Sequence, residues 1–171
     1  MRKKFCFFFI ISFFFLLTSL HAQNPSYHLF VESGGLIDFK IYSLSRYEGG
    51  ITYENWTRLK IVYRDTTPGT QVDKWNLSFK ANTPKFYGSM NEFPLNYISI
   101  EASDHNSSIG GSAIINTNKE ALSEGSYIDL VNDGDEGTYW LDITYHLDSS
   151  LVGRSTDYYT SELLFQLDTL P

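Results

Sequence analysis

The stretch 138–147 constrains the fold most, because its side chains alternate strictly between apolar and polar from Leu141 to Leu147. One parity is apolar, and the other holds Asp142, Thr144 and His146. Successive side chains of a β-strand point to opposite faces, whereas a helix would scatter the same residues around its circumference. The pattern therefore predicts a strand of an antiparallel sheet, with one face in a core and the other in water.

The same two-residue period returns in further segments that are separated by turn residues. These segments are 27–31, 36–44, 59–63, 75–81, 95–102, 113–115, 127–131 and 157–167. No long segment has a helical period, so we expect seven to nine strands in one all-β domain, residues 23–171. This number of strands and the short loops predict an antiparallel β-sandwich, with a closed β-barrel as the alternative.

Some local predictions are more specific than the fold class. In 75–81, the four residues Trp75, Leu77, Phe79 and Ala81 should face inward, and Asn76, Ser78 and Lys80 outward. Two prolines and a glycine in 82–94 predict a long loop there. We also expect one helical turn at 118–122 and an acidic loop at 132–137.

Residues 1–22 have the three regions of a secretory signal peptide. Arg2, Lys3 and Lys4 precede an apolar run at 5–17, and a more polar end closes on Ala22. The run has 13 residues, and at about 1.5 Å each they are too short for a bilayer core of about 30 Å. We therefore expect cleavage after Ala22, no membrane span afterwards, and export to the periplasm, the outer cell surface or the extracellular space.

The composition of the remaining 149 residues excludes some classes of partner. The only cysteine is Cys6, so disulfides cannot hold the exported chain, and packing or assembly must do so. Removing the three cations of the signal peptide from 13 Lys and Arg leaves 10 against 20 Asp and Glu, a net charge of −10. Such a surface repels nucleic acid and anionic membranes, so neither is an expected partner.

The sequence holds no motif typical of catalysis. His28, His105 and His146 lack metal-ligand spacing, and we expect His146 to be a solvated residue on the outward face of its strand. No Gly-x-Ser-x-Gly elbow is present to activate a serine nucleophile. We therefore expect a protein that is not an enzyme and that has no cofactor.

Two other chemistries remain open. Asp133, Asp135 and Glu136 lie on the acidic loop, which could supply oxygen ligands to Ca²⁺, although Asp-Gly is also a plain turn signal. Trp56, Trp140 and Tyr139 could form an aromatic platform that stacks on sugar rings. The alternative for these aromatics is that they cover the second face of a sheet or the end of a loop.

The closing stretch 157–167 places two tyrosines and small polar residues before an alternating strand. With the signal peptide and the run from Trp75 to Phe79, it resembles secreted pilin-like β-sandwich proteins of the spore coat U and chaperone–usher group, and exported proteins of Bacteroidetes-type bacteria. The resemblance implies an immunoglobulin-like or pilin-like sandwich that assembles by strand exchange into a surface appendage. Two departures are the missing disulfide and the short N-terminal segment, 23–31, where such pilins carry a long donor strand.

The expected function is therefore that of a structural or adhesive subunit of the cell surface or of a pilus-like appendage. The expected partners are like subunits or a periplasmic chaperone. A carbohydrate-binding module that uses exposed aromatic residues and takes a glycan is the alternative. Terminal strands often lie at sheet edges, so the predicted assembly residues are Tyr27, Leu29, Val31, Leu163, Phe165 and Leu167.

Overall fold

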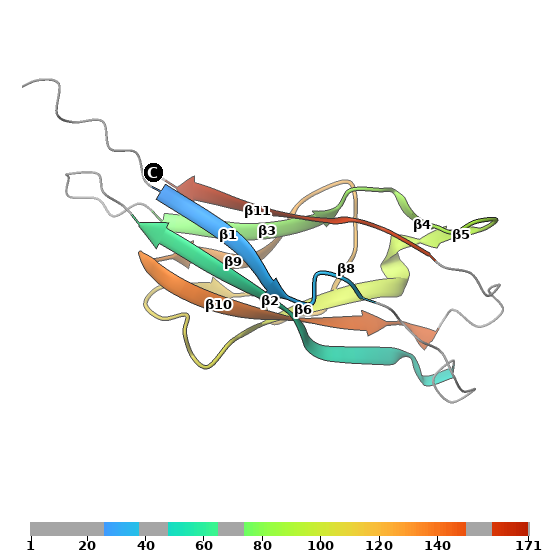
Figure 1. The fold of residues 1–171 in the computed structure, drawn as a ribbon, viewed down its shortest axis with the longest axis horizontal. Coiled ribbons are helices and arrows are strands. Elements are labelled where there is room, and N and C mark those ends of the chain that lie inside the picture. The colour runs from blue at the N-terminus through green and yellow to red at the C-terminus, as the bar shows by residue number, and fades with distance from the viewer. Residues whose placement is uncertain (1–25, 38–47, 65–73, 150–158, 171) are drawn as a thin grey trace, which may run out of the picture.

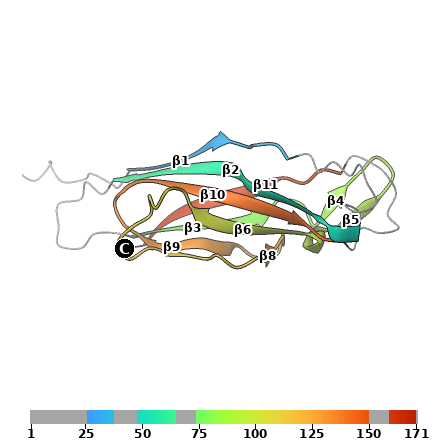
Figure 2. The same cartoon turned by 90° about the horizontal axis from the view of Figure 1, so that it is seen from below.

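The computed structural model describes residues 26–37, 48–64, 74–149 and 159–170. They form two antiparallel sheets packed face to face, which is an all-β sandwich and not a closed barrel (Figures 1 and 2). The fold class predicted from the alternation is thus confirmed. The predicted signal peptide and most of the expected strand 36–44 lie outside the described residues, and Leu36 and Ile37 are not in a strand.

The larger sheet has β10 at its centre, between β2 and β6. Leu141 of β10 lies opposite Leu59 of β2, and Ile143 lies opposite Ala102 of β6. The strand order is β1 (Ser26–Ser33), β2 (Ile51–Arg64), β10 (Gly137–Leu147), β6 (Ile98–Asp104) and β8 (Glu120–Ala121). The stretch with the strictest alternation in the sequence is therefore the middle strand of this sheet.

The smaller sheet covers the inner face of the larger one. Its strand order is β11 (Leu163–Leu170), β3 (Lys74–Ala81), β9 (Ile128–Gly134) and β7 (Ile114–Ile115). A separate short hairpin, β4 (Lys85–Tyr87) and β5 (Glu92–Pro94), leads into the 3-10 turn η1 (Leu95–Tyr97). The hairpin is tied to the chain before β11, because Tyr87 and Thr160 exchange backbone hydrogen bonds.

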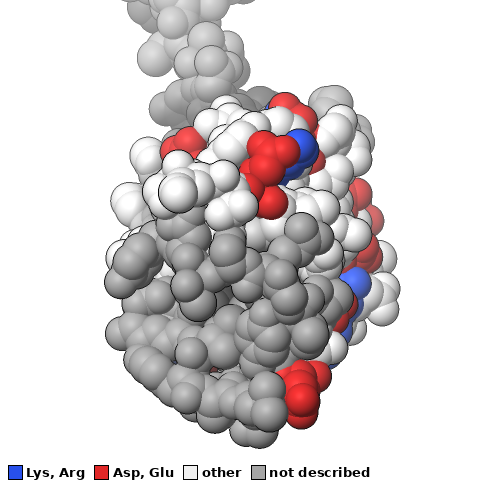
Figure 3. Space-filling view, turned by 90° about the vertical axis from the view of Figure 1, so that its right-hand side faces the viewer, with Lys and Arg blue, Asp and Glu red and all other residues white. Residues whose placement is uncertain are grey.

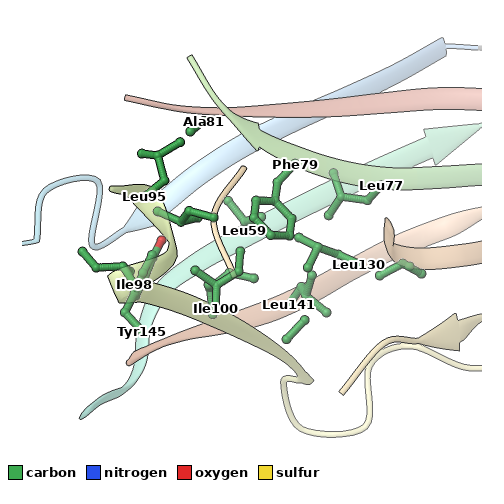
Figure 4. Packing of buried hydrophobic residues seen from close by; sticks show 14 of the residues in the cluster. Leu59, Leu77, Phe79, Ala81, Leu95, Ile98, Ile100, Leu130, Leu141 and Tyr145 are labelled. Atoms are coloured by element: carbon green, nitrogen blue, oxygen red, sulfur yellow. The ribbon is translucent and has the colours of Figure 1, made fainter. Parts of the chain in front are cut away.

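The core lies between the two sheets, where the inward side chains of both meet (Figure 4). Leu59 and Leu141 of the larger sheet and Leu77 and Phe79 of the smaller one are completely buried. Each such side chain contributes about 1.5–3 kcal/mol when it leaves water. The inward parity predicted for 75–81 and for 141–147 is confirmed by this burial.

Trp75 fixes one end of the sandwich. Its ring is completely buried, lies 5.5 Å from the ring of Tyr139 between centroids, and donates a hydrogen bond of 2.6 Å from Nε1 to the backbone oxygen of Asp135. Gly134 lies directly against the indole, and a Cβ atom there would come within 2.0 Å of Trp75 Cε2. The large ring thus requires a residue without a side chain beside it.

Three local predictions are wrong. The segment 82–94 is not one loop, because β4 and β5 pair within it, and Pro94 is tolerated at the end of a short strand. The expected helical turn at 118–122 is instead β8, where Ala121 lies opposite Ser99. The acidic loop is shorter than expected, because β9 continues to Gly134 and β10 begins at Gly137.

The outward side chains of β10 are also less exposed to solvent than their polar character predicts. Asp142 and Thr144 are buried, because neighbouring groups cover them. The Asp142 carboxylate accepts a hydrogen bond of 2.9 Å from Arg58 Nε and lies 2.7 Å from His105 Nδ1, while Thr144 Oγ1 accepts one from the amide of Asn55. These partners satisfy the polar groups that burial would otherwise leave unpaired.

Ser78 is a further correction, because it was expected to face water and is buried. Its Cα partners are Gln166 of β11 and Asp129 of β9, so its short side chain lies between two longer ones. Parity along a strand gives the direction of a side chain, and the neighbours decide whether that side chain reaches water.

Candidate functional site

The two terminal strands form one long side of the sandwich. Among the described residues, β1 is the outermost strand of the larger sheet and β11 the outermost strand of the smaller one. Figure 1 shows them along the same side and running in opposite directions, and Figure 2 shows β1 at the outer margin of the larger sheet, beside β2. The prediction that these strands lie at sheet edges is confirmed. We call the two strands together the edge surface.

The inward parity of β1 is apolar but only partly covered. Tyr27 lies opposite Tyr63 and Val31 opposite Leu59, and both partners in β2 are completely buried. Tyr27 is nevertheless 48% exposed and Val31 53% exposed. Only Leu29 of this parity is partly buried against the core. The larger sheet therefore extends past the smaller one at β1 (Figure 2).

β11 forms the corresponding edge of the smaller sheet. It pairs with β3 along its whole length, from Leu163 opposite Ala81 to Leu170 opposite Lys74. Leu163, Phe165 and Leu167 pack partly against the core, as their parity predicts. On the other side of β11, no described strand pairs with it, so backbone donors and acceptors are available along this edge.

Both strands lack part of the usual protection of a free edge, although the β1–β2 pairing has a bulge between Val31 and Ser33. Natural edge strands are often short, or carry lysine or proline, which discourage pairing with another chain. β1 and β11 have eight residues each, and neither contains Lys, Arg or Pro. Phe30 adds a half-exposed apolar ring on the outer face of β1. The sequence analysis missed Phe30, although apolar residues on both parities of 27–31 signal contacts on two faces.

The opposite long side of the sandwich has different edges. There the outermost described strands are β8 and β7, and each has only two residues. Such short edges offer little backbone for pairing. The capacity to add a strand is therefore concentrated on the edge surface.

Few charges lie on the edge surface. β1 has one carboxylate, Glu32, whose Oε1 lies 3.7 Å from Lys60 Nζ. β11 has one, Asp168, which accepts hydrogen bonds from the amide of Gln166. At the end of the molecule with the β4–β5 hairpin, a few Asp and Glu side chains lie on the described surface, some of them beside Lys or Arg (Figure 3). The edge surface thus has few charges, two carboxylates and no Lys or Arg, and is weakly acidic.

The three predicted sugar-binding aromatics are not gathered into one platform. Tyr139 is buried against Trp75, and its hydroxyl donates to the backbone oxygen of Glu136, so its expected exposure is wrong. Trp140 has Lys60 Nζ 5.5 Å from its ring. Trp56 is 41% exposed and lies 5.0 Å from the ring of Tyr53.

The acidic residues between β9 and β10 are held by protein groups. The Asp135 carboxylate pairs with Lys74 and accepts a hydrogen bond from the backbone amide of Ser112. The hydrogen bond from Lys74, followed by that from Ser112, lowers the pKa of Asp135 below its ordinary value. Within the described residues, no three His, Cys, Asp or Glu side chains are grouped to hold a metal ion. Asp133 and Glu136 therefore do not complete an oxygen cage with Asp135.

Two histidines lie on the outer face of the larger sheet, each beside a carboxylate. His146 Nδ1 is 3.0 Å from Thr52 Oγ1, and its Nε2 is 3.2 Å from Glu101 Oε2. Only 15% of the His146 side chain is exposed, so the expectation of a solvated histidine is wrong. His105 packs over the Asp142 carboxylate, with Nδ1 within hydrogen-bond distance of it. These contacts fasten neighbouring strands to one another across the sheet.

No family model and no curated protein matches this chain. The resemblance to pilin-like proteins therefore stays a prediction from the sequence. No helix in the described part of the chain is long and apolar enough to cross a membrane.

Proposed function

We propose that this chain is an exported β-sandwich subunit with a structural or adhesive role at the cell surface or in a pilus-like appendage, and that it associates through the edge surface. One observation supports this most. Both terminal strands are long sheet edges on the same side of the molecule, and they leave Tyr27 and Val31 half exposed on an apolar parity. Contiguous exposed apolar residues commonly mark sites of protein association.

Export depends on the sequence of residues 1–22, and it has a direct test. The protein is expressed in a bacterial host and recovered from the periplasmic and extracellular fractions. N-terminal sequencing should then give a chain that begins at Gln23. A chain that keeps residues 1–22 and stays with the cytosol would refute export and with it a role at the cell surface.

Association is tested with the chain that begins at Gln23, by sedimentation over a range of concentrations. Val31→Lys places a charge on the inner parity of β1, where the side chain is already exposed, so the fold should persist. We expect oligomers of the unaltered chain and at least a tenfold weaker association of Val31→Lys. Met90→Lys is the matched control, because Met90 is 85% exposed and lies between β4 and β5. A monomeric unaltered chain, or equal association of both variants, would refute the proposal.

Carbohydrate binding is the second candidate function, and the exposed ring of Trp56 beside Tyr53 favours it. Asn55 next to it has a positive φ of 49° within β2, and its side-chain oxygen accepts a hydrogen bond from Ser103. An exposed aromatic ring beside a polar amide is a suitable surface for a sugar. Binding on a glycan array that Trp56→Ala abolishes and Trp140→Ala preserves would support this function. An array without any bound glycan would exclude it.

A further inference from the structure

The two strands of the edge surface are complementary in position. β1 extends beyond the smaller sheet, which is why Tyr27 and Val31 are half exposed, and β11 lies further back in the other layer (Figure 2). Each molecule thus presents a projecting strand above a recess. A projection and a recess on the same face make that face self-complementary when a second copy is turned over.

We propose that the partner of the edge surface is a second copy of this chain, related by a two-fold axis parallel to the strands. This inference depends on the proposed association through the edge surface, and it specifies the partner and the pairing. The axis exchanges the two layers, so β1 of one copy lies beside β11 of the other. The five-stranded sheet of each copy then continues into the four-stranded sheet of its partner.

The direction and length of the strands fit this pairing. β1 and β11 run in opposite directions within one molecule, with the start of β1 and the end of β11 at the same end (Figure 1). A rotation about an axis along the strands keeps those directions, so β1 and the partner's β11 pair antiparallel. Both strands have eight residues, which is an edge of about 26 Å at 3.3 Å per residue. Phe30 then lies near the partner's Gln166 at the middle of the pair.

The recess explains why unlike strands should pair. A two-fold axis perpendicular to the sheets would place β1 beside β1 and leave an empty space between the two β11 strands in the other layer. Tyr27 and Val31 would stay exposed in that arrangement. With the axis parallel to the strands, the inner face of each β1 instead meets the inner face of the other β1. The uncovered apolar parity is buried only in the second arrangement.

Mixed single-cysteine variants test the pairing, because the chain that begins at Gln23 contains no cysteine of its own. Phe30→Cys and Gln166→Cys lie on the outward parity of β1 and β11, opposite to the core residues Leu29 and Phe165. The two variants are mixed and treated with a short bismaleimide. We expect cross-linked dimers from the mixture at a yield at least fivefold above that from either variant alone. Met90→Cys mixed with Phe30→Cys is the control that should give none.

The outcomes separate this inference from the proposed function. If the unaltered chain sediments as oligomers but Phe30→Cys cross-links mainly to itself, like strands pair and the two-fold axis proposed above is wrong, while association through the edge surface stands. If the unaltered chain is monomeric, both proposals fail. Preferential cross-linking of Phe30→Cys to Gln166→Cys, together with unchanged circular dichroism of both variants, supports the inference.

Discussion

Gly134→Ala should be among the most damaging single substitutions in this fold, although it adds only one methyl group. The new Cβ would lie 2.0 Å from Trp75 Cε2 and 2.4 Å from two more ring atoms, whereas carbon atoms in contact prefer about 3.5–4.0 Å. The indole must therefore move by about 1.5 Å. It is held by the ring of Tyr139 and by its hydrogen bond to Asp135, so movement disturbs both. Overpacking costs about 1–3 kcal/mol and the hydrogen bond about 1 kcal/mol, which together give about 2–4 kcal/mol.

Urea unfolding followed by tryptophan fluorescence and circular dichroism measures this effect. With a denaturant slope of about 2 kcal/mol per molar urea, the midpoint of Gly134→Ala should fall by about 1–2 M. Gly110→Ala is the matched control, because a Cβ there has nothing within 4 Å, and its midpoint should stay unchanged. If Gly134→Ala unfolds within about 0.5 kcal/mol of the unaltered chain, the packing argument for Trp75 is wrong.

Three further predictions concern contacts that hold the sandwich together. Tyr145→Phe should lower the free energy of unfolding by about 1 kcal/mol, because the buried hydroxyl donates a hydrogen bond of 3.0 Å to Thr57 Oγ1. Urea unfolding measures this loss, and an unchanged midpoint would contradict the prediction. Asp135 has a lowered pKa, so its contribution should be complete above its ordinary pKa near 3.8 and disappear as the pH falls through the folded value. Unfolding curves of Asp135→Asn and the unaltered chain should therefore differ at neutral pH and converge in acid, whereas a constant gap would contradict the assignment. Gly34→Ala should loosen the end of β1, because Gly34 has a φ of +67° and a Cβ there would lie 2.1 Å from the backbone oxygen of Trp56; hydrogen exchange should become faster in β1 and stay unchanged in β3.

The sequence predicted the parts of this fold that depend on period alone. The two-residue spacing of Leu141, Ile143 and Tyr145 places all three side chains on one face of a strand. They are buried, as that pattern requires. The position of 27–31 and 159–167 as first and last expected strands led to the prediction of edge strands, because such a strand has only one neighbouring strand along the chain. The short strands β7 and β8 have too few residues for a period to be visible.

Other features depend on contacts between distant residues. Asp142 looks like a solvated residue in the sequence, but Arg58 and His105, which are 84 and 37 residues away along the chain, cover its carboxylate. Alternation gives the face of a strand, and it does not give the neighbouring side chains that cover this face, such as Arg58 on β2. The exposure of Tyr27 has the same origin. Its parity predicts burial, and its exposure follows from the position of β1 as the outermost described strand of the larger sheet.

The proposed pairing has a consequence for the kind of assembly that this chain can form. A two-fold axis uses β1 and β11 of both copies at once, so the contact closes on a dimer and leaves no long edge among the described strands for a third copy. A pilus-like filament would need the β1 of each subunit to pair with the β11 of the next one without closure. Sedimentation distinguishes these assemblies, because the mean mass of a closed dimer reaches a plateau with rising concentration, whereas that of a filament continues to increase. A plateau at two copies would restrict the edge surface to pairing, and a pilus-like role would then require contacts on another face.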